Sequence, residues 1–224
     1  FAALEALYQR LPEKPQKLAA IVWPWTERKI DRSMLGGQLL EALGDLPPTK
    51  MLPYLKGMSA WQQADVVRQL AAQKKWGKLT RASLFGLCGH ASADVRSAAF
   101  RALEKQQPQG DEWSLIEGFL SRKAADIRKQ ALDMLLKCRD TDVLASAERL
   151  LAGDVNQRAA GLELLRQMAE AKRAGSKCKQ IAVLYAAGRK QITAEEQTQL
   201  AAIGDADRPQ LSLDDALGLM NPNG

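Results

Sequence analysis

The chain has 224 residues, of which 46% are hydrophobic and 26% are charged, and its formal net charge at pH 7 is +6. Its apolar content is enough for a continuous core, yet its longest apolar runs, such as Ile181–Ala187, are far shorter than the roughly 20 residues that a membrane span requires. The three cysteines are odd in number and lie far apart within helical patterns, so the sequence excludes a disulfide framework and favours reduced thiols in a cytoplasmic protein.

Apolar residues recur at helical spacing along almost the whole chain, and helix-forming residues dominate. The sequence therefore predicts an all-α protein whose first helices lie over 1–10, 15–22 and 33–43. The following helices are predicted as pairs, over 52–58 with 60–75, 79–88 with 93–106, 112–121 with 124–137, and 143–152 with 155–171. A last pair is predicted over 177–187 and 193–202, and 213–220 is expected to be a short closing helix or part of a polar tail.

One pattern recurs on the second helix of three successive pairs. It consists of an Asp or Asn, an Arg two positions later, a small residue three positions after the Arg, and then a Leu. The copies are Asp94, Arg96, Ala99 and Leu103; Asp126, Arg128, Ala131 and Leu135; and Asn156, Arg158, Gly161 and Leu165. The arginines lie 32 and 30 residues apart, and a weaker copy occurs at Arg68. Self-similarity at such a period indicates an array of stacked helical units.

Each residue of this pattern has a structural role in a stacked array. The small residue allows a neighbouring helix to approach, and the Leu supplies buried area worth about 1.5–3 kcal/mol. Asp94 and Asp126 are expected at or just before helix starts, where a carboxylate caps free amides and complements the dipole. An Arg in the first turn opposes that dipole, so we expect it to pair with an acidic residue of an adjacent unit. The predicted structural ladder comprises Asp94, Arg96, Asp126, Arg128, Asn156 and Arg158, and Arg128→Ala is expected to lower stability rather than partner binding.

These segments resemble the HEAT-repeat family of α-solenoids. The second helices of that family commonly open with Asp-x-Val-Arg-x-x-Ala, and this chain has Ala93-Asp-Val-Arg-Ser-Ala-Ala99 and Ala125-Asp-Ile-Arg-Lys-Gln-Ala131. The first helices of the family often begin Leu-Pro-x-Leu, which matches Leu52-Pro-Tyr-Leu55.

The resemblance implies a HEAT-like α-solenoid of stacked antiparallel helix pairs over residues 50–172, with atypical terminal caps over 1–49 and 174–204. The expected organisation is one elongated domain over 1–204. Residues 205–224 are then expected to be a polar tail or closing helix that leads into a further domain of a longer protein.

No catalytic, cofactor-binding or metal-binding motif is visible in the sequence. His90 is the only histidine and follows Cys88 in a predicted turn, where a turn residue is a simpler interpretation than a nucleophilic pair or a metal ligand. The acidic pairs Asp111-Glu112 and Glu195-Glu196 lie at predicted helix starts, where they complement the dipole. We therefore expect a non-catalytic fragment that needs no cofactor.

Two groups of residues are candidates for contact with a partner. Trp23 and Trp25 flank a proline in a predicted loop, while Trp61, Trp76 and Trp113 lie near helix ends, where filling the core or capping is the competing interpretation. Residues 121–190 carry fifteen basic and eight acidic side chains, and this excess is densest over 166–190. Such a stretch could bind phosphates, although a solvated helical face is the commoner origin of a charge cluster. Its candidate residues are Arg166, Lys172, Arg173, Lys177 and Lys179.

The leading hypothesis is a monomeric helical-repeat scaffold. Its concave face, lined by the second helices, would bind another protein or another part of its own parent chain. The alternative is a nucleic-acid-binding α-solenoid that uses the 166–190 stretch, as in helical-repeat DNA glycosylases, none of whose site residues can be placed on this sequence. A helical-repeat lyase or a chaperone for a prosthetic group is a third interpretation, and no residue singles it out.

Overall fold

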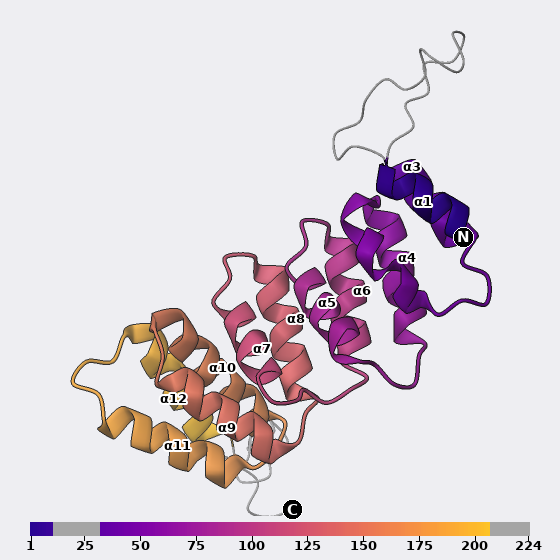
Figure 1. Cartoon of the computed structure of the whole chain (residues 1–224). Coiled ribbons are helices and arrows are strands. Elements are labelled where there is room, and N and C mark those ends of the chain that lie inside the picture. Colours follow the sequence, from indigo (N-terminus) through magenta and orange to yellow (C-terminus); the bar gives the residue numbers. More distant parts are fainter. Residues whose placement is uncertain (11–31, 207–224) are drawn as a thin grey trace, which may run out of the picture. The chain divides into compact units, whose positions relative to one another are not determined.

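The computed structural model describes residues 1–10 and 32–206, and these ranges are helical without any strand (Figure 1). The all-α prediction is confirmed for this part of the chain. No helix within the described ranges is long and apolar enough to cross a membrane. The predicted helix over 15–22, the candidates Trp23 and Trp25, and the closing segment 213–220 lie outside the described residues.

The chain divides into two compact units. Unit 1 comprises residues 1–115 and 124–131, and unit 2 comprises residues 116–123 and those from 132 onward. Helices α7 (Glu112–Leu120) and α8 (Ala125–Leu136) contribute residues to both units. The single elongated domain expected over 1–204 stays a prediction.

Unit 1 is built around the packing of two neighbouring second helices. Its elements are α1 (Ala2–Arg10), α3 (Arg32–Glu41), the 3-10 helix η1 (Pro48–Gly57), α4 (Ala60–Ala71), α5 (Lys78–Leu87) and α6 (Ala93–Leu103). Helix α4 packs along α6, α5 packs on α6, and α1 packs on α3, which in turn contacts η1 and α4. The core between them contains the fully buried Leu39, Leu70, Leu84 and Phe100.

Two predicted helices of unit 1 differ most from the observed ones. The helix predicted over 52–58 is a 3-10 helix that begins earlier, at Pro48, and contains Pro53, whose ring and missing amide disfavour a regular α-helix. Helix α4 ends at Ala71 rather than at 75. There, the indole Nε1 of Trp76 donates a hydrogen bond to the carbonyl of Leu70 at 2.8 Å and satisfies one of the last carbonyls.

Unit 2 is centred on the longest helix, α10 (Val155–Glu170), which packs against α9 (Asp140–Leu151), α11 (Gly175–Ala187) and α12 (Ala194–Asp205). Leu162, Leu165 and Met168 of α10 are completely buried. Gly161 lies against α9, where an added Cβ would be 3.2 Å from the carbonyl oxygen of Ala147. The small residue of the repeated pattern thus allows a close helix contact, as predicted.

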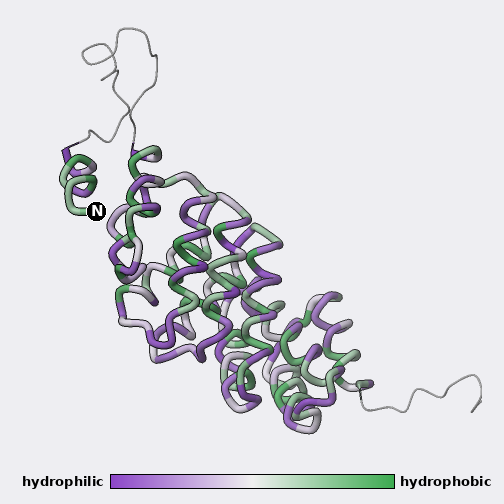
Figure 2. The backbone as a smooth tube through the Cα atoms, turned by 90° about the vertical axis from the view of Figure 1, so that its right-hand side faces the viewer, coloured by the Kyte–Doolittle hydropathy of each residue, from purple (hydrophilic) through white to green (hydrophobic). Residues whose placement is uncertain are grey.

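The helices of both units are amphipathic. Figure 2 shows hydrophobic and hydrophilic stretches alternating along the described helices, which is the pattern of elements that bury one face. In α9, for example, Val143, Ala147 and Leu150 are buried, while Glu148 and Arg149 are exposed. The helical spacing of apolar residues in the sequence therefore predicts which side of each helix is buried.

The aspartates of the repeated pattern lie in the first turn of their helices, as predicted, rather than at the N-cap position itself. Asp94 and Asp126 are the second residues of α6 and α8, and the N-cap of α6 is Ser92. Helix α10 is instead capped by Asp154, whose side chain accepts a hydrogen bond from the Gln157 amide at 2.9 Å. Helix α9 begins at Asp140 rather than at 143 as predicted, and this places two aspartates in its positively polarised first turn.

Candidate binding surface

Each unit is stabilised by ion pairs whose side chains lie about one repeat apart in the sequence. The pairs span 30 to 38 residues and are Arg81–Glu112 and Arg96–Asp126 in unit 1, with Glu117–Arg149, Asp140–Arg173 and Arg158–Glu196 in unit 2. Three of these separations fall within the 30 to 32 residues that separate the arginines of the repeated pattern, and the other two, 33 and 38, are longer. Each pair therefore joins one helix pair to the next.

Two first-turn arginines of the pattern, Arg96 and Arg158, each donate to a carboxylate and to a backbone carbonyl. Arg96 contacts the Asp126 carboxylate and also donates to the carbonyls of His90 and Ala91 at 2.7 and 2.8 Å. Arg158 similarly contacts Glu196 and donates to a carbonyl of its preceding loop. These acceptors explain why a cation is tolerated at a helix start.

The other members of the predicted ladder lie at the surface. Asp94, Arg128 and Asn156 are all exposed. Asp126 is also largely exposed, and the hydrogen bonds from Arg96 hold the pKa of its carboxyl below the ordinary value. In unit 2 the acidic partner is Glu196 of the capping box rather than an aspartate of the pattern.

The basic stretch divides into structural and surface residues. Arg166 pairs with Glu163 and Glu170 on its own helix, and Arg173 pairs with Asp140 and the carbonyl of Cys138. The exposed candidates are Lys172 and Lys177, while Lys179 is half-buried. Arg166 and Arg173 are thus already engaged within the fold.

The residues with nucleophilic or metal-binding chemistry have structural positions. His90 accepts a hydrogen bond from the Ser92 amide at its Nδ1, at 3.0 Å, as a turn residue does. Burial raises the pKa of the Cys88 thiol, which keeps it in the unreactive protonated form. No cluster of His, Cys, Asp and Glu that could hold a metal ion occurs within 1–10 and 32–206.

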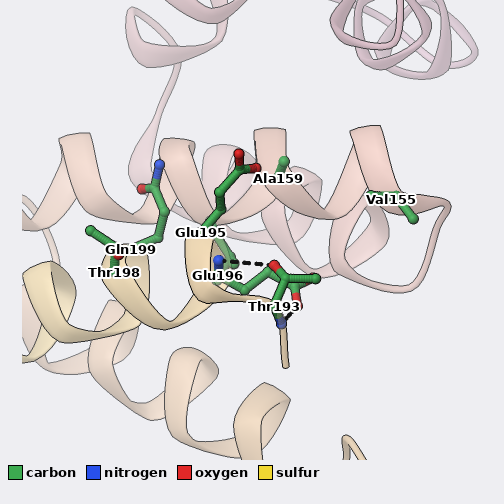
Figure 3. Close-up of a pocket in the computed structure, with 8 residues that line it drawn as sticks. Val155, Ala159, Thr193, Glu195, Glu196, Thr198 and Gln199 are labelled. Atoms are coloured by element: carbon green, nitrogen blue, oxygen red, sulfur yellow. Dashed lines mark hydrogen bonds between the residues drawn. The ribbon is translucent and has the colours of Figure 1, made fainter. Parts of the chain in front are cut away.

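An open groove of about 290 Å³ lies between α10 and the first half of α12 (Figure 3). Helix α10 contributes Val155, Ala159 and Leu162, which give the groove an apolar floor. Val155 is 61% exposed, an unusual environment for a β-branched apolar side chain in the first turn of a helix. Helix α12 contributes the polar wall formed by Thr193, Glu195, Glu196, Thr198 and Gln199.

Glu196 fixes the position of that wall. Its carboxylate accepts hydrogen bonds from the Thr193 amide at 2.9 Å, the Tyr185 hydroxyl at 2.7 Å and the Arg158 guanidinium at 3.3 Å. The bond from the Thr193 amide lowers the pKa of Glu196 most, burial opposes this, and Tyr185 and Arg158 lower it further. The net effect is an anionic, buried anchor that joins α10, α11 and α12.

The wall of the groove also carries Gln199 and Glu195. The Gln199 amide nitrogen donates to Glu163 at 3.1 Å, which leaves its buried Oε1 without a hydrogen-bond partner. Glu195 is exposed, and Figure 3 shows its side chain extending on the same side of α12 as that of Gln199. The exposed carboxylate of Glu195 is an acceptor on this wall, so the groove favours a ligand that donates hydrogen bonds.

The sequence pointed to this groove only in part. The spacing Thr193-x-x-Glu196 is a capping box, and the helix start that it marks was predicted. Nothing in the sequence connects Val155 and Ala159 with Gln199, because these residues meet only when α10 and α12 pack together. Among the tryptophans, Trp76 has the predicted capping role, whereas Trp61 is 67% exposed on α4.

A family model matches residues 1–224, the whole chain, and its description is a family of unknown function, DUF5724. The chain belongs to the DUF5724 family. No curated protein and no solved structure matches it.

Proposed function

We propose that this DUF5724 chain is a non-catalytic, HEAT-like helical-repeat scaffold that binds another protein through the groove between α10 and α12. The repeat interpretation is supported by the packing of second helices on each other, α4 on α6 and α10 on α12, and by ion pairs that span about one period. The buried thiols of Cys88, Cys138 and Cys178 support a reducing compartment such as the cytoplasm.

The single observation that carries the binding proposal is the composition of the α10–α12 groove. It combines an apolar floor, an exposed Val155 and the exposed carboxylate of Glu195. It lacks a nucleophile, because Thr193 accepts a hydrogen bond from the Glu196 amide as a cap and Thr198 donates to the Ala194 carbonyl. Such a surface suits a protein segment in which an apolar side chain lies next to a donor, such as the ammonium of a lysine or the guanidinium of an arginine.

The test compares the full chain with variants that change only the groove. Ala159→Trp fills the floor, and Glu195→Lys replaces an exposed acceptor by a cation. Glu148→Lys is the matched control, because Glu148 is an exposed acidic residue of α9 that does not line the groove. Proteins retained from a native extract on each immobilised variant are measured by quantitative mass spectrometry.

The expected result is a protein that the unchanged chain and Glu148→Lys retain equally and that both groove variants lose. A display selection of random peptides should then enrich sequences with a basic residue next to an apolar one. The proposal is wrong if no protein is retained selectively, or if all variants retain the same proteins to the same extent.

Nucleic-acid binding is the alternative, and the geometry supports it less. Arg166 and Arg173 are held by carboxylates, so the exposed cations of the candidate set are Lys172 and Lys177. A titration with duplex DNA at two salt concentrations separates the two functions. Tight binding at low salt that is lost when Lys172 and Lys177 are changed to Glu would favour the alternative.

A further inference from the structure

Three lysines lie close together where the chain passes from α4 to α5 in unit 1. They are Lys74, Lys75 and Lys78, here called the lysine turn, and all three are exposed. Among residues 1–10 and 32–206, no hydrogen bond or ion pair engages their side chains. The lysine turn therefore presents cations that no carboxylate of the described fold neutralises.

The surroundings of the lysine turn supply little opposing charge. The stretch between residues 66 and 93 contains five basic residues and no acidic one. Glu112 of the next helix pair contacts α5, but it is already paired with Arg81. Helix α5 has no acidic residue in its first turn, so the positive end of its dipole adds to the potential of the lysines.

Local hydrogen bonds hold the lysine turn in place. The carbonyl of Leu70 accepts from the indole Nε1 of Trp76 at 2.8 Å and from the amide of Gln73 at 3.0 Å. These bonds fix the segment on both sides of Lys74 and Lys75. A turn that is already ordered loses little conformational entropy when it binds a partner.

An exposed apolar strip begins beside the lysine turn. Leu79 is 69% exposed, and Ala82 and Gly86 of the same helix are also exposed. Their spacing, i, i+3 and i+7, places them along one side of α5. An added Cβ at Gly86 would meet nothing within 4 Å, so the strip is open there. This side of α5 thus combines an aliphatic anchor with cations at its beginning.

We infer that the lysine turn and the strip of Leu79, Ala82 and Gly86 form a docking surface for an acidic segment of a partner protein. The unpaired lysines select carboxylates by charge complementarity. The exposed leucine selects a protein segment with an apolar side chain, because the phosphates of a nucleic acid would leave Leu79 without an apolar contact. A single leucine also gives a lipid surface little area to take up. This surface differs from the α10–α12 groove and takes a partner of opposite charge.

The test measures how tightly the full chain binds a short synthetic peptide in which glutamates flank a leucine. Fluorescence anisotropy of the labelled peptide is recorded at low and at high salt. Lys75→Glu combined with Lys78→Glu reverses two charges of the lysine turn, and Leu79→Ser removes the aliphatic anchor.

The matched controls change exposed residues of unit 1 outside this surface. Lys50→Glu combined with Lys129→Glu reverses two other exposed lysines, and Leu7→Ser changes an exposed leucine of α1. The melting temperature of each variant reports whether it is folded.

The unchanged chain should bind the peptide, and more tightly at low salt. The lysine variant and Leu79→Ser should each weaken binding by about tenfold, because attraction becomes repulsion in the first and an apolar contact is lost in the second. The control variants should bind as the unchanged chain does.

Absence of binding at low salt, or equal weakening in the control variants, would overturn the inference. Tighter binding of duplex DNA or of phosphatidylserine vesicles that only the lysine variant abolishes would also overturn it, in favour of a nucleic acid or a lipid surface. The Glu195→Lys variant changes the α10–α12 groove alone, so the two proposals can fail independently.

Discussion

The arginine in the first turn of a second helix illustrates how a locally unfavourable residue becomes stabilising. The positive end of the helix dipole repels a guanidinium. Arg96 offsets this by donating to two loop carbonyls and to the Asp126 carboxylate. The guanidinium of an arginine can donate hydrogen bonds to several acceptors at once. The Arg96 side chain therefore binds the loop before its own helix and also contacts the next helix pair.

Arg96→Ala should therefore lower the free energy of unfolding by about 1.5–3 kcal/mol, the range for hydrogen bonds to charged groups. Urea unfolding measures this change. Arg101→Ala on the same helix is the control, since Arg101 is exposed and a surface substitution is expected to change stability by less than about 0.5 kcal/mol. Equal losses in both variants would show that the contacts of Arg96 contribute nothing. The same measurement tests the prediction made for Arg128→Ala.

Glu196 should make stability depend on pH in the acid range. Its pKa in the folded chain is lower than the ordinary value of 4.5, so its contribution is fully present above that value and is lost as the pH falls through the lower, folded value. Glu196→Gln should lower the melting temperature at pH 7 and flatten its decline below about pH 4.5. Melting curves between pH 3 and 7 test this, with Glu195→Gln, an exposed neighbour, as the control. A Glu196→Gln variant that follows the unchanged chain at every pH would contradict it.

The close contact between helices α9 and α10 depends on a residue that has no side chain. Gly161 lies close enough that an added Cβ would be 3.1 Å from the Cβ of Leu150 and 3.2 Å from the carbonyl of Ala147. A backbone carbonyl within a helix cannot move without disturbing that helix. The cost of a glycine in the middle of α10, roughly 0.5–1 kcal/mol, is therefore offset by the closer packing of two helices.

Gly161→Val should destabilise the chain by about 1–3 kcal/mol, the usual cost of overpacking a core. Gly86→Ala in α5 is the control with the opposite sign, because a Cβ there meets nothing within 4 Å. It should gain up to about 1 kcal/mol from helix propensity alone. Thermal unfolding distinguishes the two variants, and a stabilised Gly161→Val would disprove the close-approach role of this glycine.

Across the whole molecule, a substitution is expected to destabilise mainly the unit in which it lies. Each unit has its own core, and the ion pair between Arg158 and Glu196 lies within unit 2. In assemblies whose parts contact mainly their neighbours, stability is distributed locally rather than shared by all elements. A destabilising substitution in one unit should therefore first increase the local opening of the helices of that unit.

Arg158→Ala should accelerate hydrogen exchange in α10 and α12 and leave α4 and α6 close to their original rates. It leaves the buried carboxylate of Glu196 without its guanidinium partner, which is costly within unit 2. Exchange measured by mass spectrometry on the two sets of helices tests this. Uniform acceleration over both units would show that the chain unfolds as one cooperative body.

The sequence by itself determined the helices and their buried faces, because both follow from contacts between residues three or four positions apart. It also marked Gly161 as a small residue at a helix contact and Thr193 as the start of α12. The tertiary structure alone decided which acid each arginine meets, since Arg158 and Glu196 are 38 residues apart and separation in sequence does not encode distance in space. For the same reason only the fold engages Arg173 with Asp140 and brings Val155 and Gln199 into the lining of one groove, so the candidate groove could not have been found from the sequence.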